Sequence, residues 1–354
     1  MRHLIDFEDM TMDEWKDLYS LCRDIIASPE AFNSVCRGKV LGSLFYEPST
    51  RTNFSFRAAM LRLGGNVIGF SDPGSSSVSK GESLKDTVSM MSYYSDLLVM
   101  RSPVEGASKA ASLYSRVPVV NAGDGGHLHP TQTLTDLTTI MQLRGSLDGI
   151  NIGFCGDLKN GRTVHSLIKA LCRFEGVQFY LISPRELTIP DYIRVFLNRS
   201  GHKYFEVTGL EPVIPILDVL YMTRVQRERF IDPLEYERLK GIYVLDRLKL
   251  KNAKKTLLIM HPLPRIDEIA EEVDADPRAV YFEQARYGMF IRMALLYTLS
   301  KLPVEAPKIM PSRGGVSCAN PRCVTAKERY LPRAVREAGS VLRCAYCDTE
   351  MKTE

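Results

Sequence analysis

A block of hydroxyl side chains with one arginine opens a predicted helix early in the chain. An apolar run over Val40–Tyr46 indicates a strand, and soon after it come Ser49, Thr50, Arg51 and Thr52. The free N–H groups and the positive dipole end of a helix N-terminus favour anions, and an arginine fork pairs well with phosphate. Taken alone, the same residues would also serve as an ordinary helix cap. On its own, the tetrad favours simple capping, and a phosphate site is the alternative that further motifs must support.

Six further polar motifs follow, each at or just after a predicted strand. They are Lys80-Gly81-Glu82-Ser83, Val99-Met100-Arg101, His129-Pro130-Thr131-Gln132, Gly156-Asp157-Leu158 with Gly161-Arg162-Thr163, Thr223-Arg224-Val225-Gln226 and His261-Pro262-Leu263-Pro264. Arginine suits phosphates and carboxylates because its planar fork can make two parallel hydrogen bonds. A single arginine after a strand is more often structural or solvated. However, five basic residues all stand at motif positions, which argues against coincidence: Arg51, Lys80, Arg101, Arg162 and Arg224.

Strands and helices alternate from residue 40 to about residue 300. We predict strands at 40–46, 66–70, 96–100, 117–122, 150–155, 177–182, 218–222 and 256–260, and helices at 82–93, 131–143, 162–174 and 287–302. Such alternation is typical of parallel sheets covered by helices, whose ligands bind beyond the carboxyl ends of the strands. The expected fold class is therefore α/β, with two doubly wound parallel-sheet domains followed by a small C-terminal domain.

Composition and charge restrict the class of protein. A chain of 354 residues exceeds one ordinary hydrophobic core, so we expect two or three domains. No apolar run approaches the roughly 20 residues of a membrane span, and the N-terminus lacks the apolar region of a signal peptide. We therefore expect a cytoplasmic protein without a membrane partner. The net charge of +4, three units of which lie from Pro303 onward, is too small to indicate a nucleic-acid partner.

Four of the eight cysteines form two short pairs near the C-terminus. Cys318 and Cys323 are separated by four residues, and Cys344 and Cys347 by two. Two such pairs satisfy a tetrahedral, closed and therefore structural zinc site, with disulfides as the alternative. We expect one zinc ion per chain and a C-terminal segment that needs the metal to fold. The remaining cysteines are scattered in apolar surroundings and are expected to be buried and free: Cys22, Cys36, Cys155 and Cys172.

In their order and intervals, the motifs resemble aspartate carbamoyltransferase over about residues 1–302. The tail, about residues 303–354, resembles the zinc domain of the regulatory chain of the bacterial enzyme. The resemblance implies transfer of the carbamoyl group of carbamoyl phosphate to the amine of L-aspartate in pyrimidine biosynthesis, giving N-carbamoyl-L-aspartate and phosphate. It implies neither a catalytic metal nor an organic cofactor. His127 and His129 flank one residue, as metal ligands can, but apart from Asp124 no third ligand stands nearby in the sequence, so we do not expect a metal there.

The resemblance also implies which residues bind each substrate. For carbamoyl phosphate these are Ser49, Thr50, Arg51, Thr52, Ser76, Lys80, Arg101, His129 and Gln132. Thr52, Arg101, His129 and Gln132 are the catalytic residues: the first three donate to the carbonyl oxygen, and Gln132 holds the carbamoyl NH2. For aspartate they are Lys80, Arg162, Arg224 and Gln226, together with the backbone of Leu263 and Pro264. The substrate amine attacks directly, so catalysis depends mainly on proximity and electrostatics.

The small polar segment Gly74–Glu82 is expected to be a mobile loop. By resemblance, it brings a serine and Lys80 into the active site of a neighbouring subunit, so the protein would be a homotrimer or a multiple of trimers. The serine is one of Ser75, Ser76 and Ser77, and counting back from Lys80 favours Ser76.

Ornithine carbamoyltransferase shares the Ser-Thr-Arg-Thr and His-Pro-x-Gln motifs, so a transferase acting on ornithine or another amino acid is the alternative activity. Three features of this chain distinguish the aspartate enzyme from the ornithine enzyme: Lys80, Arg224 and Pro262. A pair of arginines suits a dicarboxylate and would repel the side-chain ammonium of ornithine. The sequence therefore favours aspartate.

The predicted domains are a carbamoyl-phosphate domain at 1–130 with a returning helix at 287–302, and an aspartate domain at 131–286. A linker at 303–315 and a zinc domain at 316–354 follow. No stretch remains for the nucleotide-binding domain of a regulatory chain. We therefore expect the tail to stabilise or join trimers without binding ATP or CTP, while a separate regulatory chain remains an open alternative. A zinc ribbon that binds nucleic acid is a second alternative, but acidic neighbours and the small excess of charge argue against it.

Overall fold

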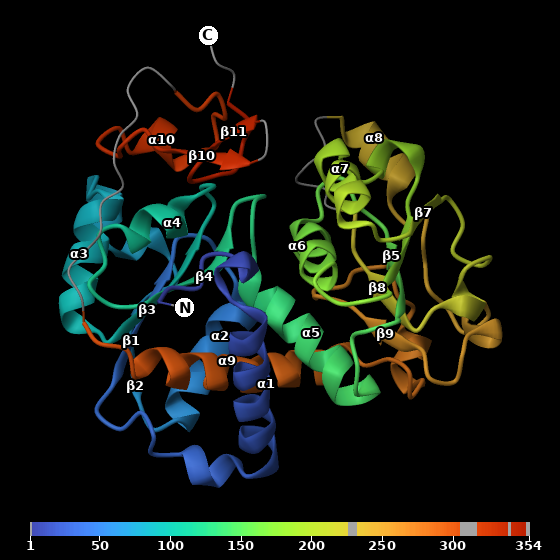
Figure 1. Ribbon diagram of the computed structural model, residues 1–354, viewed down its shortest axis with the longest axis horizontal. Helices are drawn as coiled ribbons and strands as arrows, with labels where there is room; N and C mark the ends of the chain where they lie inside the picture. Colours follow the sequence, from blue (N-terminus) through green and yellow to red (C-terminus); the bar gives the residue numbers. More distant parts are fainter. Residues whose placement is uncertain (1, 226–231, 305–316, 339–340, 352–354) are drawn as a thin grey trace. The chain divides into compact units, whose positions relative to one another are not determined.

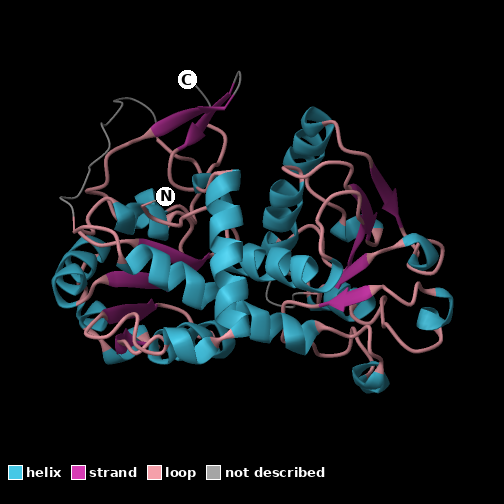
Figure 2. Cartoon of the chain, turned by 60° about the horizontal axis from the view of Figure 1, so that its bottom comes forward, coloured by secondary structure: helices cyan, strands magenta, loops and turns pink. Residues whose placement is uncertain are grey.

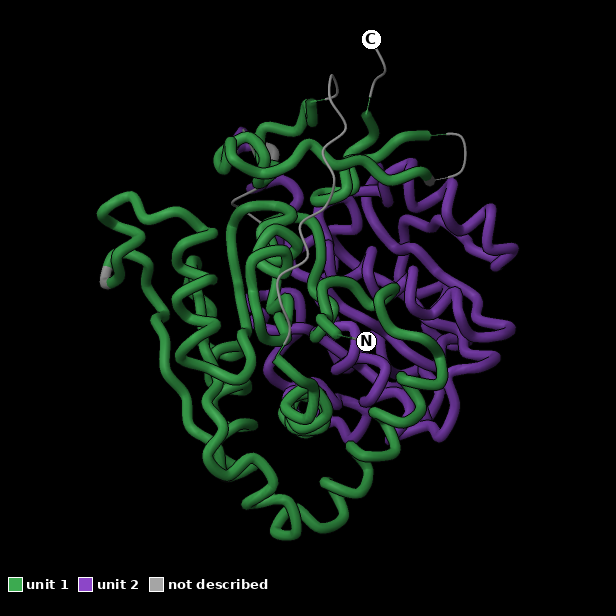
Figure 3. Tube along the Cα trace, turned by 60° about the vertical axis from the view of Figure 1, so that its left-hand side comes forward, with its two compact units in different colours: residues 1–131, 289–354 green, residues 132–288 purple. Residues whose placement is uncertain are grey.

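The computed structural model describes residues 2–225, 232–304, 317–338 and 341–351. The chain divides into two compact units (Figure 3). Unit 1 is Met1–Thr131 with Met289–Glu354, and unit 2 is Gln132–Gly288. Both boundaries fall inside helices, namely α5 (Pro130–Arg144) and α9 (Tyr281–Ser300). The four-part division expected from the sequence remains a proposal, because the contact pattern groups the tail with unit 1 rather than setting it apart.

Unit 1 is built on a parallel four-stranded sheet in the order β2-β1-β3-β4, with helices beside it (Figures 1 and 2). Its strands are β1 (Val40–Phe45), β2 (Asn66–Phe70), β3 (Leu97–Ser102) and β4 (Val119–Asp124). Its helices include α1 (Met12–Ala27), α2 (Thr50–Arg62), α3 (Leu84–Tyr94) and α4 (Ala107–Ser112). The two central strands are almost wholly buried because helices cover both faces of such a sheet, which explains their continuous apolar sequences.

Unit 2 is built on a parallel five-stranded sheet in the order β7-β6-β5-β8-β9. Its strands are β5 (Asn151–Cys155), β6 (Gln178–Ile182), β7 (Tyr204–Val207), β8 (Val219–Met222) and β9 (Leu258–Met260). Its helices include α6 (Arg162–Leu171), α7 (Asp191–Ser200) and α8 (Pro233–Leu239). The predicted α/β class with two parallel sheets is confirmed, and all eight predicted strands are present.

Among the described residues of unit 2, β7 is the one strand that the sequence prediction missed. It is a short edge strand whose four residues are half-buried or exposed, so no apolar run marks it. An edge strand pairs on one side only and needs less apolar surface than a central one. The predicted ends of β3 and β4 were also wrong, because both strands continue through polar residues to Ser102 and Asp124.

The tail folds against α3 and α4 of unit 1 (Figure 1). It consists of α10 (Val324–Lys327) and an antiparallel hairpin of β10 (Val335–Ala338) and β11 (Val341–Cys344), which was not predicted. Apolar residues of the tail, among them Leu331, Tyr346 and Met351, belong to one buried cluster. The same cluster contains Leu84, Val88 and Tyr114 from the rest of unit 1. The backbones also pair, since the N–H of Val324 donates to the carbonyl of Glu105 at 2.8 Å.

Among the helices of the described residues, none combines the length and apolar character needed to cross a membrane.

Candidate active site and metal centre

Three of the predicted motifs of unit 1 gather at one edge of its sheet. Strands β1, β3 and β4 are neighbours, and the register pairs Phe45 with Arg101 and Ser102 with Asp124. Adjacent strands lie about 4.8 Å apart. Three motifs therefore lie at the adjacent carboxyl ends of these strands. They are the tetrad at the start of α2, Arg101 on β3, and the turn that leads from β4 to His129.

The tetrad forms the N-terminus of α2, with Ser49 in the cap position. In the described residues, the Ser49 side chain makes no capping hydrogen bond, so simple capping does not account for its hydroxyl. Thr52 is buried, whereas Arg51 is exposed. Partial removal of the Arg51 guanidinium from water, and then the positive charge of Arg101, lower the pKa of Arg51. Two guanidiniums that repel each other at a helix N-terminus make a favourable place for an anion.

Arg101 is held in place from two sides. Its Nε forms an ion pair with Oε1 of Glu47 at 2.8 Å, and its Nη1 donates to the carbonyl oxygen of Ala122 at 3.4 Å. Only 14% of the Arg101 side chain is exposed. Burial lowers the pKa of Arg101, and Glu47 opposes that effect. Glu47 is thus a residue of the site that the sequence analysis did not single out, although it stands two positions before the tetrad.

His129 is buried at the end of the turn after β4, where the Oγ1 of Thr131 lies 3.4 Å from its Nδ1. The turn is closed by the carboxylate of Asp124, whose Oδ1 accepts from the N–H of Leu128 at 2.9 Å. His129 follows Leu128 directly in the chain, so its backbone position is defined by this turn.

The segment expected to be a mobile loop contains two short 3-10 turns, Pro73–Ser75 and Ser77–Lys80. Between them, the Ser76 hydroxyl donates to the carbonyl of Pro73 at 2.9 Å and accepts from the N–H of Val78 at 3.3 Å. Lys80 is exposed, and the side chain of Ser75 lies outside the described residues. The choice of Ser76 as the serine that reaches a neighbouring site remains a prediction.

Unit 2 gathers its own three motifs in the same way. Strands β5, β8 and β9 are neighbours, and Arg162, Arg224 and the loop His261–Pro264 follow their carboxyl ends. Arg162 begins α6, and both arginines are half-buried. Gln226 lies outside the described residues. Two arginines at adjacent strand ends suit a ligand with two carboxylates.

The loop after β9 is fixed by a buried histidine. The His261 Nδ1 accepts from the N–H of Leu263 at 2.7 Å, and its Nε2 lies 2.6 Å from Oε1 of Glu268. Burial raises the pKa of Glu268, but the interactions with His261 and the hydrogen bonds from backbone N–H groups together outweigh this effect and lower the pKa overall. Leu263 has a φ of 54°, and the Leu263–Pro264 peptide is cis. A positive φ at a leucine costs about 1–2 kcal/mol, so the surrounding contacts must hold this loop in shape.

Asp136, on α5, accepts hydrogen bonds from residues of several parts of unit 2. It was not predicted from the sequence. It is fully buried, and its Oδ1 accepts from Nε2 of Gln132 at 2.8 Å and from Nε2 of Gln284 at 2.7 Å. Its Oδ2 accepts from the hydroxyl of Tyr221, on β8, at 3.0 Å. Gln284 in turn accepts from the N–H of His261 at 2.9 Å. One carboxylate therefore orients Gln132 and supports the loop after β9.

Replacing Asp136 by asparagine is expected to lower both stability and turnover. The asparagine oxygen can still accept from the two glutamines, but its NH2 then faces the Tyr221 hydroxyl that donates to Asp136 in the wild type. A buried donor without an acceptor costs about 1–3 kcal/mol. Urea unfolding and steady-state kinetics would measure the two effects. Asp191→Asn, on the exposed face of α7, is the matched control, and equal behaviour of the two variants would contradict the assignment.

The four clustered cysteines of the tail form a site that fits zinc. Their sulfur atoms all lie within 4.8 Å of one another, with 3.6 Å between Cys318 and Cys347 and 3.8 Å between Cys323 and Cys344. A tetrahedral ion with Zn–S bonds of about 2.3 Å sets sulfur–sulfur distances of about 3.8 Å. All four thiols are free, which disfavours the disulfide alternative.

The surroundings of the cluster agree with a closed, structural site. Three of the four cysteines are buried, and hydrogen bonds from Cys323 and Cys344 lower the pKa of Cys347. Thr325 Oγ1 donates to the sulfur of Cys323 at 3.2 Å. Four sulfur ligands complete a zinc coordination shell and leave no open position for catalysis. The scattered cysteines are also free, as predicted; three are buried and Cys172 is half-buried.

Comparisons with known proteins agree with this organisation. Residues 2–142 match the family model "Aspartate/ornithine carbamoyltransferase, carbamoyl-P binding domain", and residues 148–299 match "Aspartate/ornithine carbamoyltransferase, Asp/Orn binding domain". Residues 312–354 match "Aspartate carbamoyltransferase regulatory chain, metal binding domain".

Relatives of known name point the same way. The aspartate carbamoyltransferase catalytic subunit of Clostridium perfringens (strain ATCC 13124) is 58% identical over 84% of this chain and 97% of its own length. Among solved structures, the catalytic subunit of M. jannaschii aspartate transcarbamoylase has a TM-score of 0.80 at 49% identity, covering 84% of this chain and 98% of that one. The Trypanosoma cruzi aspartate transcarbamoylase in complex with N-(phosphonacetyl)-L-aspartic acid has a TM-score of 0.79 at 39% identity, covering 84% and 95%.

The models of the two catalytic domains end at residue 299, before the cysteine cluster, which the regulatory-chain model at residues 312–354 covers. Both parts of the resemblance seen in the sequence are thereby confirmed. The chain belongs to the aspartate carbamoyltransferase family, with the catalytic domains joined in one polypeptide to a metal-binding domain of the regulatory-chain type.

Proposed function

We propose that this chain transfers the carbamoyl group of carbamoyl phosphate to the amine of L-aspartate, forming N-carbamoyl-L-aspartate and phosphate for pyrimidine synthesis. The observation that carries the proposal is the grouping of the Ser49–Thr52 tetrad, Arg101 and the His129 turn at adjacent carboxyl ends of one sheet. Arg162, Arg224 and the loop after β9 group in the same way in unit 2.

Unit 1 supplies the chemistry for carbamoyl phosphate. The N-terminus of α2, with Arg51, binds the phosphate, while Thr52, Arg101 and His129 donate to the carbonyl oxygen. As the amine attacks, negative charge grows on that oxygen, and donors already held in place stabilise it without reorganisation. The C–O bond to phosphate then breaks, and the departing phosphate accepts the proton of the amine. Gln132, oriented by Asp136, holds the carbamoyl NH2.

Unit 2 supplies the chemistry for the amino acid. Arg162, Arg224 and Gln226 bind the carboxylates of aspartate, and the backbone of Leu263 and Pro264 accepts from its ammonium group. Paired guanidiniums favour a dicarboxylate and oppose the side-chain ammonium of ornithine. This charge preference supports aspartate over the ornithine alternative.

The assembly we propose is a homotrimer, or a multiple of trimers, in which Ser76 and Lys80 complete the active site of a neighbouring subunit. Lys80 is exposed and is therefore accessible to a second chain. A cytoplasmic location remains a prediction, as does a tail without nucleotide binding. A separate regulatory chain remains the alternative for regulation.

An activity assay tests the proposal. Wild-type enzyme is expected to release phosphate from carbamoyl phosphate with aspartate and not with ornithine. Arg51→Ala should raise the KM for carbamoyl phosphate, because hydrogen bonds to charged groups contribute about 1.5–3 kcal/mol, or roughly 10- to 150-fold. Arg173→Ala, a half-buried arginine of unit 2 outside the motifs, is the control. Activity with ornithine alone would refute the aspartate assignment.

A further inference from the structure

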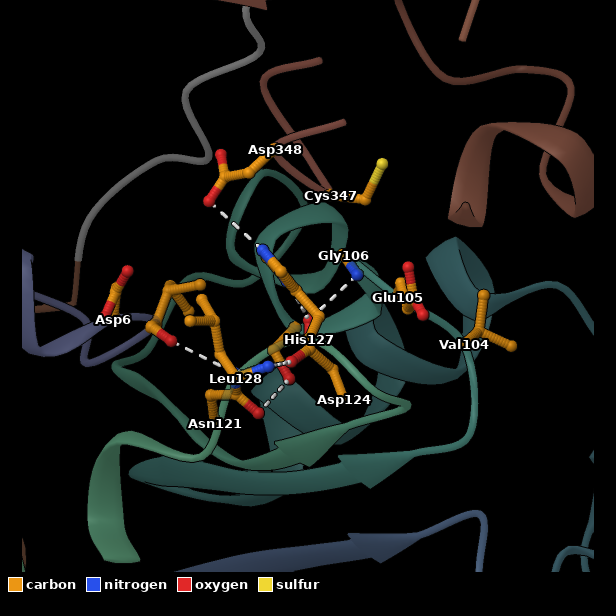
Figure 4. Close-up of polar contacts among 12 residues, drawn as sticks. Asp6, Val104, Glu105, Gly106, Asn121, Asp124, His127, Leu128, Cys347 and Asp348 are labelled. Atoms are coloured by element: carbon orange, nitrogen blue, oxygen red, sulfur yellow. Dashed lines mark hydrogen bonds and ion pairs between the residues drawn. The ribbon is translucent and has the colours of Figure 1, made fainter. Parts of the chain in front are cut away.

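The turn that leads to His129 contacts the metal-binding tail through one histidine. His127 lies between two carboxylates, with Nδ1 at 3.1 Å from Oδ2 of Asp124 and Nε2 at 3.1 Å from Oδ2 of Asp348 (Figure 4). Asp124 belongs to the end of β4, and Asp348 belongs to the tail. The side chain of His127 is 11% exposed and that of Asp124 is 1% exposed, so water competes little for these contacts.

The buried carboxylate of Asp124 stabilises the turn that leads to His129. Besides His127, its Oδ2 accepts from the N–H of Gly106 at 2.8 Å, and its Oδ1 accepts from Leu128 at 2.9 Å and from Nδ2 of Asn121 at 3.2 Å. A carboxylate with four donors cannot rotate without breaking several bonds at once. The position of the Leu128 backbone, and hence of His129 beside it, therefore depends on Asp124.

Asp348 is held by the fold of the metal centre. It follows Cys347 directly, and its N–H donates to the carbonyl of Cys344 at 3.1 Å. Its Oδ1 accepts from Nε of Arg336 at 2.8 Å, which leaves Oδ2 toward His127. The two metal-binding cysteines of this turn thus determine where the carboxylate lies.

The charges of the three groups reinforce one another. Burial disfavours the charged imidazole of His127, but Asp124 and Asp348 outweigh that effect and raise its pKa well above 6.5. A charged imidazole donates from both ring nitrogens, and hydrogen bonds between charged groups are about twice as strong as neutral ones. Neither carboxylate alone would satisfy both nitrogens.

We propose that Asp348 is a positioning residue for catalysis: acting through His127 and Asp124, it holds the turn that aims His129 at the carbamoyl oxygen. The inference rests on the proposed function, because it assigns a further residue to the same site. The metal-binding tail is then part of the scaffold of the active site in its own chain, beyond any effect on stability or assembly. Zinc supports catalysis indirectly, by shaping the turn that carries Asp348.

We call the contact from Asp348 through His127 to Asp124 the link. The variant Asp348→Gly tests this link with little strain on the tail. Asp348 has a φ of 60°, a conformation that glycine adopts without steric cost, so the variant removes the carboxylate while the backbone is retained. We expect kcat to fall by roughly 10- to 100-fold, since small misplacements of catalytic groups cost up to about 100-fold, with little change in the KM for carbamoyl phosphate. Asp348→Asn, whose amide oxygen still accepts from His127, should recover most of the loss.

Tyr330→Phe is the matched control. It removes a different hydrogen bond between the tail and unit 1, in which the N–H of Lys85 donates to the Tyr330 hydroxyl at 2.8 Å, and it leaves the His129 turn untouched. Its kcat should equal that of the wild type. Zinc content and melting temperature are measured for all variants. If Asp348→Gly loses zinc, His127→Leu breaks the same link without altering the tail, and the same fall in kcat is expected.

A double-mutant comparison separates positioning from general damage. In a His129→Ala background, breaking the link should lower the residual kcat no further, because no imidazole remains to be aimed. The proposal is overturned if the link variants turn over like Tyr330→Phe, or if they lower kcat by the same factor with and without His129. Wild-type enzyme inactive toward both aspartate and ornithine would instead refute the proposed function itself.

Discussion

Replacing Arg101 by alanine is expected to lower kcat by about 100- to 1,000-fold, the usual loss when one donor to a developing oxyanion is removed. Arg101 donates to the carbonyl oxygen in the proposed mechanism and lies beside Arg51 at the phosphate end of the site. The variant also removes the ion pair of 2.8 Å between Arg101 and Glu47, so a positive charge is lost and the Glu47 carboxylate stays near an anionic substrate. The KM for carbamoyl phosphate should therefore rise as well.

Steady-state kinetics with varied carbamoyl phosphate would measure both effects. Arg101→Lys keeps the charge but loses the fork and should fall between the wild type and the alanine variant. Arg62→Gln, at the exposed end of α2, controls for removal of a positive charge from unit 1 and should behave as wild type. An Arg101→Ala enzyme within a factor of two of the wild type would remove Arg101 from the mechanism.

Loss of the tail metal is expected to unfold the tail and destabilise unit 1. Structural zinc binding contributes about 10–16 kcal/mol in small domains, which have too little core to fold without it. The tail shares its apolar cluster with α3 and α4, so its unfolding would expose residues such as Leu84, Val88 and Tyr114 to water. Chelation, or the variant Cys344→Ser, should therefore lower the melting temperature and allow proteolysis within residues 317–351.

Zinc content per chain, thermal melting and limited proteolysis, measured together, would test this expectation. Cys172→Ser replaces a half-buried free cysteine of unit 2 and should leave all three unchanged. If Cys344→Ser retained the melting temperature and protease resistance of the wild type, the metal would not be needed to hold the tail.

The parallel sheets and the placement of the motifs could be predicted because their signals are local. Buried parallel strands are continuous apolar runs, and the polar residues that bind ligands follow directly at the strand ends. Arg101 and His129 could be placed in this way without knowing which strands are neighbours. The cysteine pairs are equally local, since close spacing of ligands is what a metal-binding turn requires.

Long-range polar contacts could not be predicted, because no local pattern marks them. Asp136 stands one turn beyond Gln132, yet nothing nearby shows that Gln284, 148 residues later, shares its carboxylate. The contact between His127 and Asp348 spans 221 residues. In the sequence, His127 was considered only as a metal ligand and rejected, whereas in the structure it contacts the carboxylates of Asp124 and Asp348. The packing of the tail on unit 1 was missed for the same reason.

Mass spectrometry of the carbamoylated product tests the proposed activity directly. Zinc-replete enzyme would receive carbamoyl phosphate with equal concentrations of aspartate and ornithine. We expect N-carbamoyl-L-aspartate, with one phosphate released per product and no carbamoylated ornithine. Carbamoylated ornithine as the main product, or release of phosphate without any carbamoylated amino acid, would contradict the proposed activity.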